Sequence, residues 1–151
     1  MSHGYTPATT EPRDVLAAAL RAQASGSLPA MAAADLFIET TWMDDLRFVQ
    51  RFVQVGQSHT DPSVLMAVVD WRAALAAIDS GALYASSSAD VLLRACASLR
   101  RVGKVDLADL SCLDNTNIRL VARAVLACRE LTTLEETPDE MATRAWLSGL
   151  H

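Results

Sequence analysis

Length, composition and charge narrow the classes of protein to which this chain can belong. Its 151 residues are enough for one domain that buries roughly 70% of the unfolded chain's surface, so it can fold without disulfides or metals. The residues are 51% hydrophobic but only 5% aromatic, a balance typical of packed helices. A formal net charge of -5 disfavours a broad nucleic-acid surface, which needs excess Lys and Arg, and no stretch approaches the ~18 apolar residues of a membrane span.

The cysteines and the basic residues indicate a cellular setting. Cys96, Cys112 and Cys128 stand singly, without the close pairs that zinc sites use and without the even number of a disulfide framework. We therefore expect no metal, no cofactor and a reducing compartment. The N-terminus lacks a basic start followed by an apolar run, so we expect a cytoplasmic protein. Arginine supplies twelve of the thirteen Lys and Arg residues, which together with the abundance of alanine indicates a GC-rich bacterial genome.

The first part of the chain predicts a tail followed by two helices. Residues 1–10 are polar and have no periodicity, so we expect a flexible tail there and a single helical domain over 11–151. Pro12 precedes an apolar stripe of helical spacing, which predicts a first helix that Gly26 ends. Ser27 is then placed to cap a second helix.

The middle of the chain predicts two more helices. Apolar spacing over 46–53 predicts a helix closed by Gly56, with Trp42 at the corner before it. An Asp-Pro pair at 61–62 is typical of an N-cap and first turn, and it predicts the most regular amphipathic helix of the chain, ended by Gly81. The apolar positions of this helix are Val64, Leu65, Val68, Trp71, Leu75 and Ile78.

Three helices in succession are predicted after the serine cluster of residues 86–88. We expect Ser88 to cap the first of them and Gly103 to stop it. A short leucine-spaced helix over 106–113 follows, and Asp114 or Asn115 then caps a longer one.

A last helix and the fold class complete the prediction. Thr137, Pro138 and Glu140 form a capping box at the start of the final helix. The sequence thus predicts an all-α fold, a compact bundle of seven or eight short helices with a trihelical C-terminal half and no strand. The loop over 81–88 is the expected boundary if the chain divides.

No acids, bases, histidines and cysteines converge in the sequence as a reactive set. His59 has Ser58 and Asp61 nearby, but residues of one short loop rarely adopt the geometry of a catalytic triad. The paired carboxylates lie at or before helix starts, where the helix dipole stabilises them, and the six glycines stand singly rather than in a phosphate cradle. We therefore expect no catalytic residue and a non-enzymatic protein.

Large aromatic side chains point to an interaction surface. The second and third predicted helices are apolar on more than one face, and such a helix must be buried in its own core or against a partner. Our first hypothesis is a protein-interaction module that binds itself or another protein through Trp42, Phe48, Phe52 and Trp71. The alternative left open is that the same side chains simply form the core.

Two further hypotheses come from other classes of protein. The trihelical segment resembles a helix-turn-helix unit, and its third helix carries Asn115, Asn117, Arg119 and Arg123, which could contact DNA. Residues 90–130 carry a net charge of only +2, whereas DNA-binding surfaces are markedly basic. The other hypothesis is a small-molecule site between helices, which alanine-rich packing could leave open.

A pattern of capping and core residues runs through about residues 65–130. It comprises Val69, Asp70, Trp71, Ala73, Ala74, Ala77, Ile78, Asp79, Gly81, Leu83, Ser87, Ser88, Leu92, Ser98, Leu99, Val105, Leu107, Leu113, Asp114 and Asn117. This pattern is similar to that of short uncharacterised actinobacterial proteins, often encoded near mobile elements. The resemblance implies a bacterial cytoplasmic setting and brings no activity, cofactor or catalytic residue.

Overall fold

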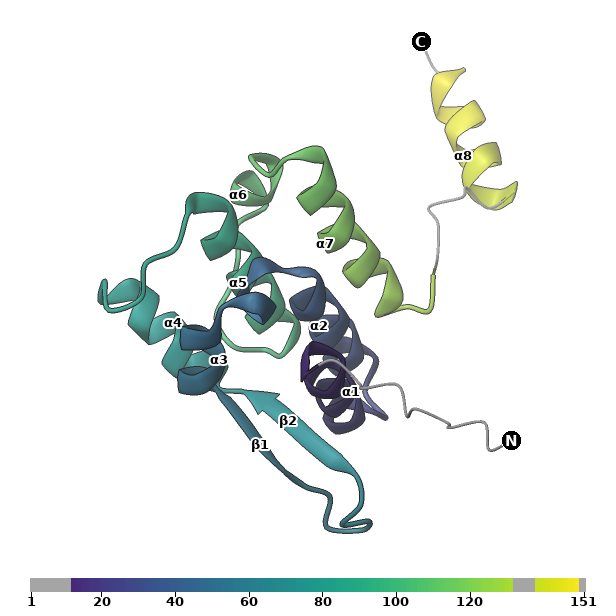
Figure 1. Ribbon diagram of the computed structural model, residues 1–151. Helices are drawn as coiled ribbons and strands as arrows, with labels where there is room; N and C mark the ends of the chain where they lie inside the picture. Colours follow the sequence, from purple (N-terminus) through teal and green to yellow (C-terminus); the bar gives the residue numbers. More distant parts are fainter. Residues whose placement is uncertain (1–11, 132–137, 150–151) are drawn as a thin grey trace, which may run out of the picture.

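The computed structural model describes residues 12–131 and 138–149, and over these it is predominantly helical (Figure 1). A two-stranded antiparallel sheet interrupts the helices near the middle of the chain. The expected tail over 1–10 and the expected cap at Thr137 lie outside the described residues. In chain order the elements are α1 (Pro12–Ala24), α2 (Leu28–Glu39), η1 (Thr41–Asp44), α3 (Leu46–Phe52), β1 (Val53–Gln57), β2 (Leu65–Val69), α4 (Trp71–Asp79), α5 (Ser87–Leu99), α6 (Leu107–Ser111), α7 (Asn115–Ala127) and α8 (Pro138–Ser148).

Short polar side chains begin the helices, because an N-cap oxygen accepts a hydrogen bond from an otherwise unpaired backbone N–H. Ser27 caps α2 by accepting from the amide of Ala30, which confirms that prediction, and of the two candidates for the start of α7 the N-cap is Asp114 and not Asn115. The prediction for α5 was wrong by two residues, since Ser86 rather than Ser88 is its N-cap.

The prediction of an all-α fold is wrong over residues 53–69. Val53–Gln57 pairs antiparallel with Leu65–Val69, and α4 begins only at Trp71, where Asp70 is the N-cap. Asp61 does not start a helix. Its carboxylate accepts hydrogen bonds from the backbone and hydroxyl of Ser63, which is the short-range bonding by which Asp also stabilises turns. The same polar chemistry that caps a helix therefore closes a hairpin here.

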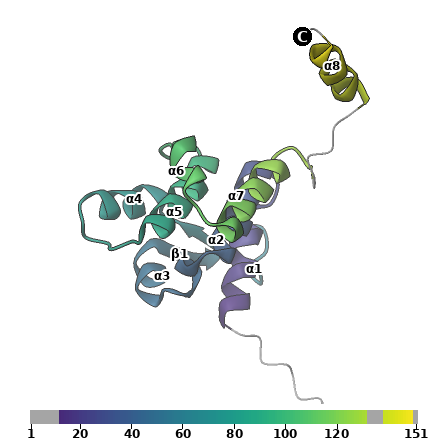
Figure 2. The same ribbon diagram turned by 90° about the horizontal axis from the view of Figure 1, so that it is seen from above.

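Helix α2 lies at the centre of the described domain. It packs against α1, α5 and α7, and α1 also covers strand β2. Figures 1 and 2 show α2 enclosed by these elements, while the β-hairpin extends from one side. Seven α2 residues are buried, which explains why this helix looked apolar on more than one face: Ala30, Ala32, Ala33, Ala34, Leu36, Phe37 and Ile38.

An aromatic cluster fills the core between α2, α3 and α4. Phe37 and Phe48 are fully buried, with ring centroids 5.8 Å apart. Phe37 and Trp71 form a T-shaped pair with ring centroids 5.7 Å apart, and the centroids of Trp42 and Phe48 are 4.9 Å apart. The indole nitrogen of Trp42 donates a 2.8 Å hydrogen bond to the carbonyl of Ala89, so this corner residue also ties η1 to α5.

The end of α5 differs from the expected stop at Gly103. The helix ends at Leu99, and Arg101 takes the left-handed conformation, with a φ of 60°. The amides of Arg101 and Val102 donate to the carbonyls of Ser98 and Ala97, which is the Schellman pattern. Glycine usually occupies this left-handed position because it has no Cβ.

Helix α8 stands apart from the rest of the described chain in both views (Figures 1 and 2). None of its residues is buried. Its large apolar side chains Met141, Trp146 and Leu147 are all exposed.

We expect Phe48→Ala to lower the free energy of unfolding by about 3–5 kcal/mol, because it removes the side chain that joins the other aromatic rings. Denaturant titration followed by circular dichroism measures this change. Leu46→Ala is the matched control on the same helix. Leu46 is 73% exposed, and its truncation should change stability by no more than about 0.5 kcal/mol. Equal effects of the two variants would contradict the assignment of the core.

We expect Arg101→Gly to raise the free energy of unfolding by about 0.5–1 kcal/mol. Glycine removes the steric cost of the left-handed conformation. This gain is larger than the cost of the extra conformational entropy that glycine gives to the unfolded chain. The control is Arg101→Ala, which removes the same charge but keeps a Cβ at a φ of 60° and should give no gain. A similar gain from both variants in thermal or denaturant unfolding would assign the effect to charge instead.

Candidate functional site

A surface groove of about 420 Å³ lies between α2 and α7, with one side chain from α1 at its edge. Its floor is apolar and is built mainly of small side chains. Alanines on both helices leave the space open, because no long side chain projects from those positions to fill it. The lining residues are Arg21, Ala32, Asp35, Leu36, Glu39, Leu120, Arg123, Ala124 and Ala127.

Charged side chains form the two rims of this groove. On the α2 rim, Asp35 and Glu39 are one helical turn apart, and the Nε of Arg21 donates to Asp35 at 2.9 Å. On the α7 rim stands Arg123. Within the described residues, neither Glu39 nor Arg123 has an ion pair. The groove thus combines an apolar floor with an acidic group on one side and a cation on the other.

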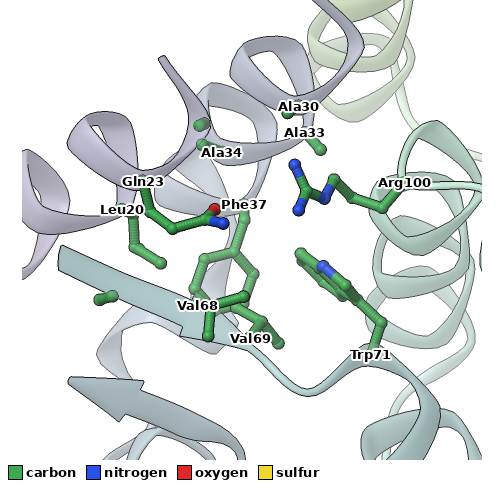
Figure 3. Close-up of a pocket in the computed structure, with 12 residues that line it drawn as sticks. Leu20, Gln23, Ala30, Ala33, Ala34, Phe37, Val68, Val69, Trp71 and Arg100 are labelled. Atoms are coloured by element: carbon green, nitrogen blue, oxygen red, sulfur yellow. The ribbon is translucent and has the colours of Figure 1, made fainter. Parts of the chain in front are cut away.

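A second, smaller hollow lies where α1, α2, β2 and the end of α5 meet. Figure 3 shows the side chains of Gln23 and Arg100 directed toward it, over the rings of Phe37 and Trp71. Its volume is about 20 Å³. This is room for one water molecule, for which the two polar groups are suitable partners. A substrate-sized ligand does not fit.

The four residues predicted to mediate protein interaction lie in the core. Trp42, Phe48, Phe52 and Trp71 are at most 8% exposed, and they pack on one another or on Phe37. A partner cannot reach them in this structure. The alternative left open by the sequence, that they form the core, accounts for their position, because the hydrophobic effect favours burial equally in a core and in an interface.

The four residues of the DNA-binding hypothesis all lie on α7, as predicted. Asn115 and Arg119 are exposed, whereas Asn117 is tied to the helix cap by hydrogen bonds to both carboxylate oxygens of Asp114. Arg123 lines the groove that Asp35 and Glu39 also line. Carboxylates so placed repel phosphate, so this side of α7 does not offer an extended basic face.

The other arginines of this half lie elsewhere. Arg100 and Arg101 line a separate hollow with Ser27 and Pro29 at the start of α2. Arg94 donates to Asp79 and Asp90, both at 2.6 Å. The hydrogen bond to Asp79 is the main reason that the pKa of Arg94 is raised. These guanidinium groups therefore do not join Arg123 in one basic surface.

The loop around His59 has a structural role. Ser58 is buried, and its hydroxyl lies 3.0 Å from that of Thr60 and accepts from two backbone amides of the loop. Hydrogen bonds from Ser63 lower the pKa of Asp61, while the side chain of His59 is exposed. Within the described residues, no three His, Cys, Asp or Glu side chains gather in a way that could hold a metal ion.

Of the residues that line the groove, sequence reasoning singled out only Arg123, and it assigned that residue to DNA binding. α2 and α7 are far apart in the sequence, so no local pattern joins Glu39 to Arg123. The available signal was the repetition of alanine in both helices, at Ala32 and at Ala124 and Ala127. That signal indicates close packing as readily as an open groove, because the outcome depends on how the helices cross.

The chain matches no family model, no curated protein and no solved structure. In the two described segments, no helix combines the length and the apolarity needed to cross a bilayer.

We expect the cysteines to differ in reactivity. Burial raises the pKa of the Cys96 thiol, so the nucleophilic thiolate is scarce there, whereas Cys112 is exposed. Iodoacetamide at pH 8 should modify Cys112 within minutes and leave Cys96 unmodified until the chain is unfolded in denaturant. Peptide mass spectrometry measures both sites. Modification of Cys96 in the folded protein at the rate of Cys112 would show that the core opens readily.

Proposed function

We propose that this protein is a non-enzymatic interaction module that binds an amphipathic helix in the groove between α2 and α7. The observation that carries the proposal is the groove itself, with its apolar floor and opposite charges on its two rims. Helix-in-groove recognition uses an apolar stripe for affinity and flanking charges for orientation. The partner is another protein or a second copy of the chain.

The non-enzymatic part of the proposal is supported by the roles of the ionisable side chains. Asp45, Asp70 and Asp114 cap helices, and Arg94 joins α4 to α5 through Asp79 and Asp90. These groups are occupied in ways that stabilise the fold. The groove offers Asp35, Glu39 and Arg123, which suit recognition of a charged partner and have no nucleophile beside them among its lining residues.

A bacterial cytoplasm is part of the same proposal. It is supported by composition, since arginine is preferred over lysine and the three cysteines suit a reducing compartment. DNA binding by Asn115, Asn117, Arg119 and Arg123 is the less supported alternative, because carboxylates share the groove with Arg123. A small-molecule ligand of the groove is a further alternative, and its carboxylates and arginines would favour a zwitterionic compound.

The groove is tested by filling it. Ala127→Arg places a long side chain into the groove from its α7 wall, whereas Ala122→Arg makes the same change at an exposed position of α7 outside the groove lining. Both variants and the wild type are expressed with an affinity tag in cells of the source organism, together with a differently tagged copy of the wild-type chain. We expect a protein, or the second copy, to be retained by the wild type and by Ala122→Arg.

Retention of that protein by Ala127→Arg should fall by at least about tenfold, because a fully buried hot-spot contact is worth about one such factor or more. Quantitative mass spectrometry of the retained fractions measures it, and circular dichroism verifies that both variants are folded. If Ala127→Arg and Ala122→Arg retain the same proteins in the same amounts, the groove does not mediate binding and the proposal is wrong.

A further inference from the structure

We infer that the groove binds helix α8 of a second copy of this chain, in a reciprocal exchange between two subunits. The inference rests on the proposed function, since it names the helix that the groove receives. The structure places both halves of such a contact on one chain: an open groove between α2 and α7, and an amphipathic helix with no buried residue.

Helix α8 has one apolar stripe. At about 100° per residue, Met141, Ala142, Ala145 and Trp146 share a face, in the i, i+1, i+4, i+5 pattern of a helix that packs on another surface. Met141 is 57% exposed and Trp146 is 66% exposed. Trp is the residue type most often found as the dominant anchor of an interface, so its exposure on this stripe marks a contact that lies outside the described domain.

The helix is too short to be stable without a packing partner. α8 has 11 residues, whereas isolated helices shorter than about 12–15 residues are marginal in water. In globular proteins the missing stability comes from burial of the apolar face. Nothing in the described part of the chain buries that face, so a second surface has to cover it.

The dimensions of the groove suit this stripe. The α7 wall runs from Leu120 to Ala127, a rise of about 10 Å at 1.5 Å per residue. The stripe from Met141 to Trp146 rises about 7.5 Å on the same basis. A volume of about 420 Å³ accommodates a large aromatic side chain together with its smaller neighbours.

The charges on the two surfaces are complementary. On the helical wheel, Asp139 flanks the stripe on the side of Trp146. The groove presents Arg123 on the α7 rim and Glu39 with Asp35 on the α2 rim. One orientation of α8 therefore brings Asp139 to the rim that carries Arg123, which fixes the direction of the helix.

A second copy is the occupant that matches the described arrangement. α8 extends away from α2 and α7 in Figures 1 and 2, so the groove of its own chain stays open. Exchange of α8 between two chains fills both grooves and covers both stripes with a single twofold axis. A one-way contact would leave one groove and one stripe exposed and would propagate into a filament.

Two matched variants on α8 test this contact. Trp146 and Leu147 are adjacent and similarly exposed, but the helical repeat places Leu147 on the opposite face. In sedimentation equilibrium the wild type should be a dimer. Trp146→Ala should raise the dimer Kd by at least about tenfold, as expected for a hot-spot residue, while Leu147→Ala should change it by less than about threefold. Equal effects of both variants would overturn the inference.

Disulfide trapping distinguishes exchange from fold-back. One chain carries Ala127→Cys and another carries Ala145→Cys, which lies on the same stripe and leaves Trp146 in place, both in a Cys112→Ser, Cys128→Ser background in which Cys96 stays buried. On mixing and mild oxidation, we expect a disulfide that joins the two different chains. A chain that carries both substitutions should likewise give covalent dimers. A link within a single monomer, or no link, would overturn the exchange.

Different experimental results would contradict the exchange of α8 and the proposed function of the groove. In one outcome, the wild-type chain is monomeric at all concentrations and retains another protein, and Ala127→Arg no longer retains it. This outcome would support the groove as a binding site and would rule out α8 of a second copy as its occupant. A dimer that is insensitive to both Trp146→Ala and Ala127→Arg would rule out the exchange, and equal retention of other proteins by Ala127→Arg and Ala122→Arg would in addition rule out the proposed function.

Discussion

Burial of the aromatic cluster around Phe37 and Phe48 is the constraint on which the rest of the structure depends. These two rings join residues from α2, α3 and α4, and Trp42 extends the cluster to α5 through its hydrogen bond to Ala89. A chain with few aromatic residues concentrates most of them in one place. On the side of α2 that faces α7, Ala32 and Leu36 are buried while Asp35 and Glu39 are exposed, and the groove lies between these two helices.

Several charged residues stabilise the fold, whereas Glu39 and Arg123 line the groove. Aspartates begin α3, α4 and α7, and Arg94 holds α4 against α5. Such exposed or half-exposed ion pairs contribute little free energy individually, but they orient the elements that they join. The groove differs in that Glu39 and Arg123 face the same space with no partner among the described residues. The two opposite charges therefore orient a bound helix, while the apolar lining contributes affinity.

Within the proposed function, the groove and the apolar stripe of α8 are the two surfaces of one contact. Exposure of the apolar stripe of α8 to water is unfavourable, and so is that of the half-buried Leu120 and Ala127 of the groove. Each surface supplies what the other lacks: small residues that leave space, and Met141 and Trp146 that fill space. Association through these surfaces does not need Trp42, Phe48, Phe52 or Trp71, which the domain already uses for its own core.

The sequence by itself determined the local features, and the tertiary structure decided which surfaces meet. Ser27 and Asp114 mark helix starts because capping involves only residues within one turn. The hairpin of 53–69 escaped prediction because its ladder joins residues that are not neighbours in the chain, while Asp61 bonds in the same way in a turn as in a cap. The sequence singled out Trp42, Phe48, Phe52 and Trp71, but their burial in a core rather than an interface depends on how α2, α3 and α4 pack. The groove depends likewise on the crossing of α2 and α7, which no local pattern encodes.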